Sequence, residues 1–509
     1  MKNMNTSKRI IINTSITYLR SIFAAFVGIF TTRWVLNSLG VEDYGLYGLV
    51  GSILVFISFL NNVLAGAISR YFAYEVGRRN NDELNKWFNA AIRIHLLVPI
   101  FLVIIGLIIG TIAINCWLNI EIENIKIASV VFYISLFSAS VSMCLAPYRG
   151  MLLAKQDISQ QSIIEILQSL CHVILMYVLT LVNRNQLLIY SIMMAAESVI
   201  FQILIALRAN HIYSEISIKN YKYHELKSYV LELFSFSAWK SLIGFGVMMF
   251  NQGLSIILNL FFGTKLNAAY SVASNLSAQS NTISNALMMS ITPEIVSRQG
   301  AGNKESMIRL ALKACKYSTL MVLLIAVPLF LDIDNLLLLW LKTPPQYTGI
   351  LCRFIIISLV IDKLTSGLES AINACGQIKK FQISVGLSYI LGVLLTILLL
   401  LIKKTPIIIG VSYLITQSMI LVMRLFWARK LVGIQLWRWV SGAFNPIAIV
   451  SLLTVSGCLF MMNCLPKLGI VRLITITLSS TFSLFLFAWL FVLEVNLKEQ
   501  IKARLSKHK

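Results

Sequence analysis

The sequence predicts an all-α, polytopic membrane protein of about fourteen transmembrane helices, and three observations support this fold class. The chain has 509 residues, of which 58% are hydrophobic, and its mean hydropathy is +0.80. Only 13% of the residues are charged, whereas soluble domains carry roughly 25%. The apolar residues also form runs of about 20 residues, the length that crosses ~30 Å of hydrocarbon. So little charge leaves too few polar side chains to cover a water-soluble particle.

Lysine and arginine are sorted between the two sides of the predicted spans. The termini and the even-numbered loops hold 29 of the 43 Lys and Arg residues, the odd-numbered loops hold 9, and five lie within spans. Because positive loops stay on the cytoplasmic side, this alternating bias predicts cytoplasmic termini. The predicted spans are 12–35, 44–66, 88–115, 126–147, 159–182, 187–208, 234–262, 267–292, 314–335, 348–373, 380–402, 406–428, 445–465 and 470–493.

Some spans are less certain from their composition. Span 267–292 is rich in Asn and Ser, and Lys403 and Lys404 put positive charge on the outer side. A twelve-span arrangement is therefore the alternative. The first apolar stretch contains Arg20 and runs past signal-peptide length, so we expect it to be a retained span.

Charge, cysteines and loop lengths exclude several functional classes. The net charge of +22 indicates positive-inside bias and attraction to anionic lipid, with no nucleic-acid partner. The eight cysteines form no CxxC pair and the histidines form no HExxH motif, so no metal or cofactor site is expected. No predicted loop is long enough for an ATPase domain, and no phosphate-binding loop is present. Any transport must therefore use an ion gradient, the membrane potential or the substrate's own gradient.

Residues of the first half of the chain recur in the second half at a constant shift of 223 positions. Four residues of the first stretch have the same residue type 223 positions later: Gly40, Tyr47, Gly77 and Asn80 match Gly263, Tyr270, Gly300 and Asn303. Both stretches run from a long span through a polar span to a basic loop. The shift equals six spans and preserves topology, as in transporters built from two parallel halves. We therefore expect a six-helix bundle at 1–230, a second at 231–440, and two further helices with a basic tail at 441–509.

Six segments of the chain match a known family: LNSLGVEDYGLYGLVG (36–51), AISRYFAYEVGRRNNDEL (67–84), APYRGMLLAKQD (146–157), NQGLSIILNLFFG (251–263), NALMMSITPEIVSRQGAGNKESM (285–307) and LDIDNLLLLWLKTPP (331–345). They resemble bacterial polysaccharide-unit flippases of the multidrug/oligosaccharidyl-lipid/polysaccharide exporter superfamily. They occur in the order expected for the family and cover roughly residues 8 to 430.

The resemblance implies two six-helix bundles around a central cavity that opens alternately to each side. It implies a substrate of oligosaccharide on undecaprenyl diphosphate, moved to the outer leaflet of the bacterial inner membrane for surface polysaccharide such as O-antigen. A polysaccharide polymerase is an expected partner. Two extra C-terminal spans are a feature of some relatives, notably the peptidoglycan-precursor flippase.

Ionisable side chains within the spans are the first candidates for function, because they are costly in a bilayer. We predict that Arg20, Lys240 and Lys363, with Arg353 and Arg70 more peripheral, contact the diphosphate or acidic sugars. One alternative is that the side chains of Arg20, Lys240 and Arg353 extend to the nearby membrane–water interface. Another is that Lys363 pairs with a carboxylate such as Glu369.

Carboxylates and amides supply the other candidates. Glu197, Glu165 and Glu369 are predicted to couple transport to a proton or sodium gradient, the alternative being that each pairs with a structural Lys or Arg. Asp362 and Glu369 are seven residues apart and should share a helix face. Span 267–292 carries polar residues at steps of about four, among them Asn275, Gln279 and Asn285. This stripe either faces the sugar or bonds neighbouring helices.

Two outer segments are expected to be structural. Gly40 and Gly45 flank two acidic residues, and Gly40 is suited to a positive φ at a helix end. The stretch 332–345, with Trp340 among leucines, is typical of an interfacial segment.

Three other functions compete with the flippase. A drug/cation antiporter of the multidrug and toxic compound extrusion type shares the architecture but should favour an acidic cavity. A membrane glycosyltransferase or polymerase, which would be an enzyme, commonly needs a sizeable outer loop or soluble domain, and none is present. A purely structural protein would not need so many polar groups within its spans.

Overall fold

The computed structural model describes residues 6–155, 157–213, 216–219, 221–240, 242–376, 378–463, 465–466 and 468–492. Over these residues the chain is helical apart from short connections, with no strand. The all-α fold class is confirmed. By its internal contacts the chain divides into unit 1, residues 1–271, and unit 2, residues 272–509.

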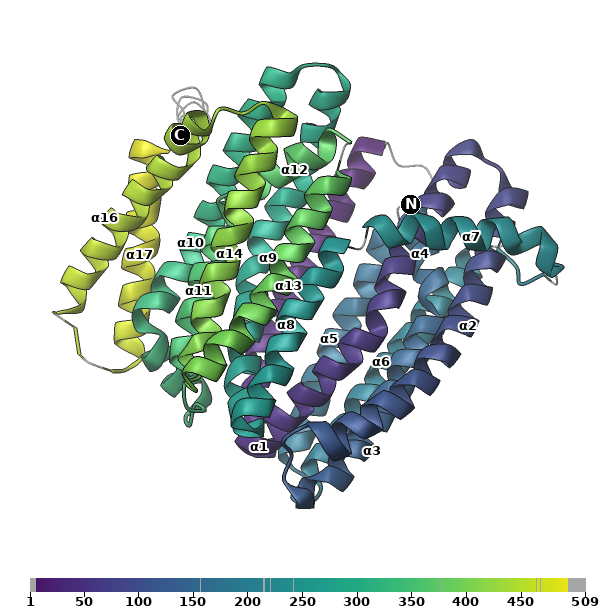
Figure 1. The fold of residues 1–509 in the computed structure, drawn as a ribbon, viewed down its shortest axis with the longest axis horizontal. Coiled ribbons are helices and arrows are strands. Elements are labelled where there is room, and N and C mark those ends of the chain that lie inside the picture. The colour runs from purple at the N-terminus through teal and green to yellow at the C-terminus, as the bar shows by residue number, and fades with distance from the viewer. Residues whose placement is uncertain are drawn as a thin grey trace. The chain divides into compact units, whose positions relative to one another are not determined.

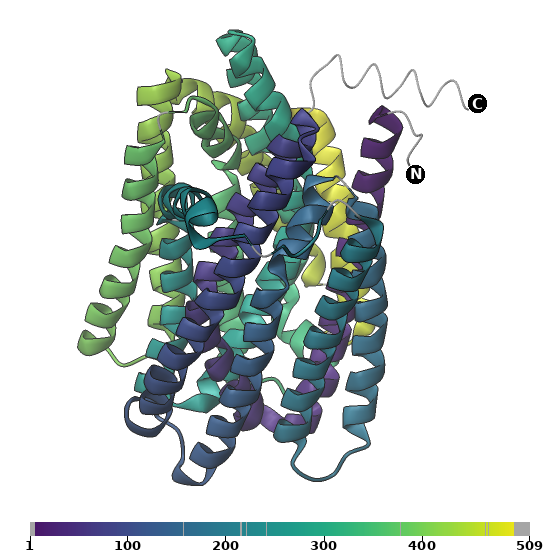
Figure 2. The ribbon, with the colours of Figure 1, turned by 90° about the vertical axis from the view of Figure 1, so that its right-hand side faces the viewer.

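Unit 1 consists of long helices with one helix set across them. α7 lies crosswise to α2 and α4 in Figure 1 and is seen end-on, in teal, in Figure 2. The elements are α1 (Thr6–Arg78), α2 (Asn81–Ile112), the π-helical turn η1 (Ala113–Trp117), α3 (Ile122–Cys144), α4 (Ala146–Ala154), α5 (Ile158–Thr180), α6 (Gln186–Ile212), α7 (Tyr223–Lys240), α8 (Leu242–Phe262) and the start of α9 (Thr264–Gly300).

Unit 2 holds the rest of α9 and the helices that follow. They are α10 (Lys304–Leu341), α11 (Thr348–Lys363), α12 (Ser366–Ala374), α13 (Lys379–Ile402), α14 (Ile407–Trp427), η2 (Ala428–Val432), α15 (Leu436–Trp439), η3 (Val440–Phe444), α16 (Asn445–Met462) and α17 (Ile470–Phe491). The predicted boundaries at 230/231 and 440/441 remain predictions.

The predicted spans correspond to helices throughout the chain. Among the described residues, eleven helices are long and apolar enough to cross a membrane. The other three predicted spans are helical too: the first two are counted as one apolar helix, α9 is too polar, and α11 is short. Within predicted span 234–262, however, the structure has the end of α7 and then α8.

Exposed apolar stripes are consistent with contact with lipid. On α2, Leu97, Phe101, Ile104 and Ile108 are all exposed at steps of three and four residues, so they lie on one face of the helix. Apolar helices that expose such stripes and satisfy their own backbone hydrogen bonds are suited to a bilayer. The protein is a multi-pass membrane protein.

Glycine breaks α1 where the sequence predicted a structural turn. Gly40 has φ 77° and ψ 173°, so α1 is two helices joined at that residue. Nearby, a Cβ on Gly45 would lie 2.1 Å from the carbonyl oxygen of Thr264. Only glycine permits this approach of α1 to α9, and the structural interpretation of this motif is confirmed.

The predicted repeat is present in the backbone. Gly263 has φ 79°, close to the value at Gly40. Asn80 caps α2 by accepting a hydrogen bond from the Glu83 N–H (3.2 Å), and Asn303 caps α10 by accepting one from Ser306 (3.1 Å). The residue before each cap also has a positive φ, which is 57° at Arg79 and 73° at Gly302.

The repeat continues beyond the four residues that revealed it. α2 and α10 begin at Asn81 and Lys304, which are related by the same shift as Asn80 and Asn303. The long and short pair α3–α4 is matched by α11–α12, and α5 and α6 are matched by α13 and α14. We call α1–α6 the first repeat and α7–α14 the second; α16 and α17 fall outside it.

The last helix is fastened to α10 at both ends. Asp332, where α10 kinks, accepts a hydrogen bond from the Arg472 Nε at 2.7 Å, and both side chains are buried or nearly so. Asn335 exchanges hydrogen bonds with Gly469, one residue before α17. At the other end, the Lys316 ammonium donates to the Val492 carbonyl oxygen at 3.1 Å. Asp332 to Leu341 is therefore a continuation of α10 whose first residue docks α17.

Candidate functional site

A polar stripe runs along α5 within unit 1. Gln161, Glu165, Gln168 and His172 follow one another at steps of four, three and four residues, so they share one helix face. Their partners come from α1, α4 and α6. Both predicted ion-coupling carboxylates of the first repeat, Glu165 and Glu197, belong to this arrangement.

Glu165 lies between two arginines. Arg149 Nη2 donates to its Oε1 at 2.7 Å, the Gln161 amide donates to the same oxygen at 2.8 Å, and Arg20 pairs with Oε2. The side chains of Arg20 and Arg149 are 25% and 43% exposed, and that of Glu165 is 16% exposed. Two positive charges against one negative charge leave a partly accessible, net cationic cluster, which we call the Arg20–Arg149 cluster.

Glu197 is held by histidine instead of arginine. His172 Nδ1 lies 2.9 Å from its Oε2, and the Gln168 amide donates to its Oε1 at 3.2 Å. Glu197 is buried on α6. This carboxylate–imidazole contact joins α6 to the polar face of α5, and an ion-coupling role for Glu197 remains a prediction.

In unit 2 an arginine bridges a broken helix. The chain leaves helical geometry between α11 and α12, at Thr365, which has φ −125° and ψ 7°. Arg424 of α14 donates to Asp362 Oδ1 at 2.7 Å, to the Asp362 carbonyl at 3.1 Å and to Thr365 Oγ1 at 3.2 Å. Its other terminal nitrogen lies 2.6 Å from Glu369 Oε2. Asp362 and Glu369 thus meet one guanidinium, although the predicted single helix is broken between them.

Lys363 completes this second network. Its ammonium lies 3.2 Å from Asp362 Oδ2 and donates to Asn285 Oδ1 of α9 at 3.2 Å. Lys363 and Arg424 are both buried, and two cations balance two carboxylates. We call Asp362, Lys363, Glu369 and Arg424 the Arg424 network. The carboxylate partner of Lys363 is therefore Asp362, and Glu369 pairs with Arg424 instead.

The polar stripe of α9 divides into two kinds of contact. Asn267 is buried and donates to the Ser255 carbonyl at 2.7 Å, which is a structural contact with α8. Gln279 donates to Asn275 Oδ1 at 3.2 Å along the same helix, and both side chains are half-buried. Asn285 is exposed apart from its contact with Lys363. Facing a sugar remains a prediction for Asn275, Gln279 and Asn285.

Of the other predicted cations, only Arg353 has a side chain in the described part of the chain. Arg353 pairs with Asp334 at 2.7 Å, near the turn between α10 and α11. Arg93 donates to the Tyr221 carbonyl, which ties α2 to the segment before α7. Arg70 lies on α1 and Lys240 ends α7, but their side chains are outside the described part of the chain.

Three ionisable members of these networks are not singled out by the sequence: Arg149, His172 and Arg424. Arg424 falls within predicted span 406–428 and is buried on α14. His172 was not singled out, although its spacing from Glu165 and Gln168 is helical. Among the described residues, no group of three His, Cys, Asp or Glu side chains is placed to hold a metal ion.

Comparisons with known proteins identify the fold. No protein-family model and no curated protein sequence matches the chain. A solved structure of the lipid II flippase MurJ in an inward closed conformation aligns with a TM-score of 0.72 and 15% identity, covering 94% of this chain and 98% of MurJ.

Drug-transporter structures align as well. An inward-facing multidrug resistance MATE family transporter of the MOP superfamily gives a TM-score of 0.67 at 14% identity, covering 81% of this chain and 94% of its own. The eukaryotic MATE transporter AtDTX14 gives 0.61 at 16% identity, with 84% and 99% covered. The chain has the fold that these flippase and MATE structures share.

Proposed function

We propose that this protein is a flippase that moves oligosaccharide linked to undecaprenyl diphosphate from the cytoplasmic to the outer leaflet by alternating access. The observation that carries the proposal is the Arg20–Arg149 cluster: two partly exposed arginines that share one carboxylate in a bundle of apolar helices. A guanidinium group can bind a phosphate through two parallel N–H···O hydrogen bonds. A diphosphate would therefore replace Glu165 as their partner.

The predicted topology puts this cluster where the cargo would enter. Arg149 belongs to a segment expected on the cytoplasmic side, which is where the lipid-linked unit would be captured. The net positive charge attracts an anionic head group, and partly exposed arginines can be reached by it without rearrangement of the helices. The Arg424 network has no surplus charge and both its cations are buried, so we assign it to the scaffold, with a Lys363–Asn285 contact at its edge.

The C-terminal helices favour a flippase over a drug pump. Residues 445–509 make up more than a tenth of the chain, so an alignment that covers 94% of it must include part of them. The MATE alignments cover 81% and 84% and can omit them entirely. The alignment with the flippase structure thus extends into residues 445–509, the region of the two C-terminal helices.

Energy for transport would come from an ion gradient acting on the first repeat. Glu197, which is buried, lies 2.9 Å from Nδ1 of the partly exposed His172, and this pair would bind and release a proton as unit 1 changes its exposure to each side. The expected setting is a bacterial inner membrane with cytoplasmic termini, working with a polysaccharide polymerase.

The alternative function is an ion-coupled drug/cation antiporter. Buried Glu197 is the observation that favours it, because a carboxylate that carries protons can also attract a cationic drug. Such a pump should not need Arg20 and Arg149, since two arginines repel a cation.

A flipping assay separates these functions. The protein is reconstituted into vesicles with an undecaprenyl-diphosphate-linked disaccharide, and the leaflet of the sugar is read with a membrane-impermeant oxidant. Arg20→Gln with Arg149→Gln should slow flipping roughly tenfold or more, since each charge-assisted hydrogen bond is worth about 1.5–3 kcal/mol.

Arg208→Gln is the matched control, because Arg208 donates to the side chain of Gln160 on α5 and lies outside the cluster. It should flip normally. Wild-type flipping in the double variant would overturn the diphosphate site. Absence of flipping in the wild-type protein, together with uptake of a cationic dye against a proton gradient, would establish the antiporter.

A further inference from the structure

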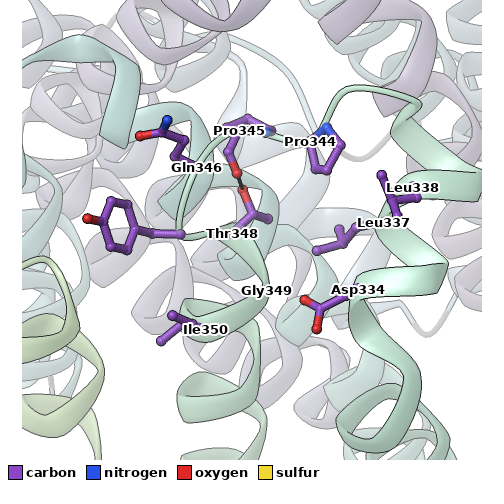
Figure 3. A pocket seen from close by; sticks show the side chains of 10 residues that line it. Asp334, Leu337, Leu338, Pro344, Pro345, Gln346, Thr348, Gly349 and Ile350 are labelled. Atoms are coloured by element: carbon purple, nitrogen blue, oxygen red, sulfur yellow. Dashed lines mark hydrogen bonds between the residues drawn. The ribbon is translucent and has the colours of Figure 1, made fainter.

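A cavity opens at the turn between α10 and α11, and none of its lining residues belongs to either charged network. Its volume is about 590 Å³, within the range of roughly 300–1,000 Å³ usual for small-molecule sites. Figure 3 shows Asp334 and Leu337 on one side, Ile350 at the start of α11 and Pro344, Pro345 and Gln346 across the turn. The predicted topology places this turn on the outer side of the membrane.

The turn is held in a strained backbone conformation. Lys342 has φ 63° and Tyr347 has φ 65°, values that residues other than glycine rarely adopt. They bracket Pro344 and Pro345, and the Thr348 hydroxyl donates to the Pro345 carbonyl at 2.7 Å (Figure 3). Strain of this kind persists where the surroundings fix it and is concentrated at binding sites.

The polar groups that line the cavity differ in whether another residue of the protein already binds them. A Cβ on Gly349 would lie 2.2 Å from Asp334 Oδ1, so glycine is required for the carboxylate to sit there. Arg353 Nη2 lies 2.7 Å from Asp334 Oδ2 and cancels its charge. Within the described residues, the Gln346 amide and the Tyr347 hydroxyl have no hydrogen-bond partner. Both side chains are exposed.

We propose that this cavity binds a sugar ring of the cargo on the outer side, and this inference rests on the proposed function. The Asp334 carboxylate, whose charge is balanced by Arg353, and the Gln346 amide offer acceptors and donors for neighbouring hydroxyls. Tyr347 and Leu337 offer apolar surface for the C–H face of the ring. Because the ion pair is neutral, the cavity favours an uncharged saccharide over a free cation or a phosphate.

Saturation-transfer NMR on the full-length protein in detergent tests this site directly. The probes are N-acetylglucosamine, glucose and galacturonic acid, with tetraphenylphosphonium as a cationic probe. We expect saturation of the neutral sugars. Tyr347→Gly should weaken their signal about threefold to tenfold, the usual effect of losing one aromatic contact.

Lys342→Gly is the matched control for that variant. Glycine relieves the same kind of positive φ at both positions, but only Tyr347 lines the cavity. Lys342→Gly should therefore bind sugars as the wild type does, and Gln346→Ala should weaken binding.

Three outcomes overturn the proposal: no sugar signal in the wild type, equal loss in the two glycine variants, or a tetraphenylphosphonium signal that Tyr347→Gly abolishes. Binding is measured without transport, so its failure is distinct from failure of the flipping assay. A protein that flips lipid-linked disaccharide but gives no sugar signal would keep the proposed function and lose this site.

Discussion

The two repeats of this chain use the same backbone and different charges. Gly40 and Gly263 have φ values of 77° and 79°, and Asn80 and Asn303 both cap the helix that follows. The charged side chains of the two networks are not shared in this way. At the shift that relates Gly40 to Gly263, the counterpart of Glu165 is Ser388 and that of Arg424 is Phe201.

This difference separates what the fold needs from what a site needs. A left-handed residue and a side-chain cap stabilise a helix end through local backbone geometry, and both copies have them at equivalent positions. The charged networks solve different problems: the Arg20–Arg149 cluster is partly exposed with surplus positive charge, while the Arg424 network is balanced around two buried cations. The comparison predicts that backbone variants behave alike in the two repeats and that charge variants do not.

The largest expected effect is loss of Arg424. Arg424→Met should destabilise the protein by about 2–4 kcal/mol, because it leaves the half-buried carboxylates of Asp362 and Glu369 without their guanidinium. Fluorescence-detected size-exclusion after heating measures the loss. Adding Asp362→Asn and Glu369→Gln to Arg424→Met should restore much of the stability. If that triple variant is no more stable than Arg424→Met, the network is not held by charge balance.

A second effect should appear in transport and only in the first repeat. Glu197→Gln keeps a hydrogen-bonding side chain beside Gln168 but cannot carry a proton, so imposed proton or sodium gradients should no longer stimulate flipping. Glu369→Gln, which removes a carboxylate of the second repeat, is the control and should leave the stimulation in place. Normal stimulation of the Glu197→Gln variant under every imposed gradient would rule out its coupling role.

Alanine at the two left-handed glycines should cost the same in both repeats. Gly40→Ala and Gly263→Ala should each destabilise by about 1–2 kcal/mol, because φ is positive and a Cβ has room at both positions. Apparent melting temperatures compare the two. Gly51→Ala is the control, since its Cβ also meets no atom within 4 Å but its helical backbone suits alanine. A large difference between Gly40→Ala and Gly263→Ala would contradict the equivalence.

The smallest expected effect concerns the caps. Asn80→Ala and Asn303→Ala should each lose about 1 kcal/mol, since each removes one side-chain acceptor from a helix N-terminus. Asn80→Asp and Asn303→Asp should retain the stability, because aspartate caps equally well. Thermal scans of the four variants would show whether the caps in the two repeats are interchangeable.

Much of the fold could be predicted because its signals are local. Apolar runs of membrane length indicated the spans, and the glycine and asparagine recurrences indicated the repeat before any contact was known. The broken span at α11–α12 could not be predicted in the same way. Leu364 and Thr365 are not helix-breaking residue types, and the break is stabilised by Arg424, which is distant in the chain.

The candidate sites were predicted less completely. Arg20, Glu165, Glu197, Lys363 and Glu369 were singled out because charge within a span is costly, but the sequence did not pair them. Arg149 and Arg424 lie near the ends of predicted spans, where basic residues are common, and only the structure shows that they pair with carboxylates. His172 was missed because a search for Lys, Arg, Asp and Glu within the spans does not include histidine, although its spacing from Glu165 and Gln168 is helical.

The sequence by itself determined that this chain is an all-α membrane protein, that it repeats with a constant shift and that its helix ends lie at particular glycines and asparagines. Those properties depend on hydrophobicity and backbone geometry, which neighbouring residues specify. Only the tertiary structure decided which charges meet, which are balanced and which keep a surplus. Partners such as Arg20 and Glu165 are distant in the chain, and their pairing depends on how whole helices pack.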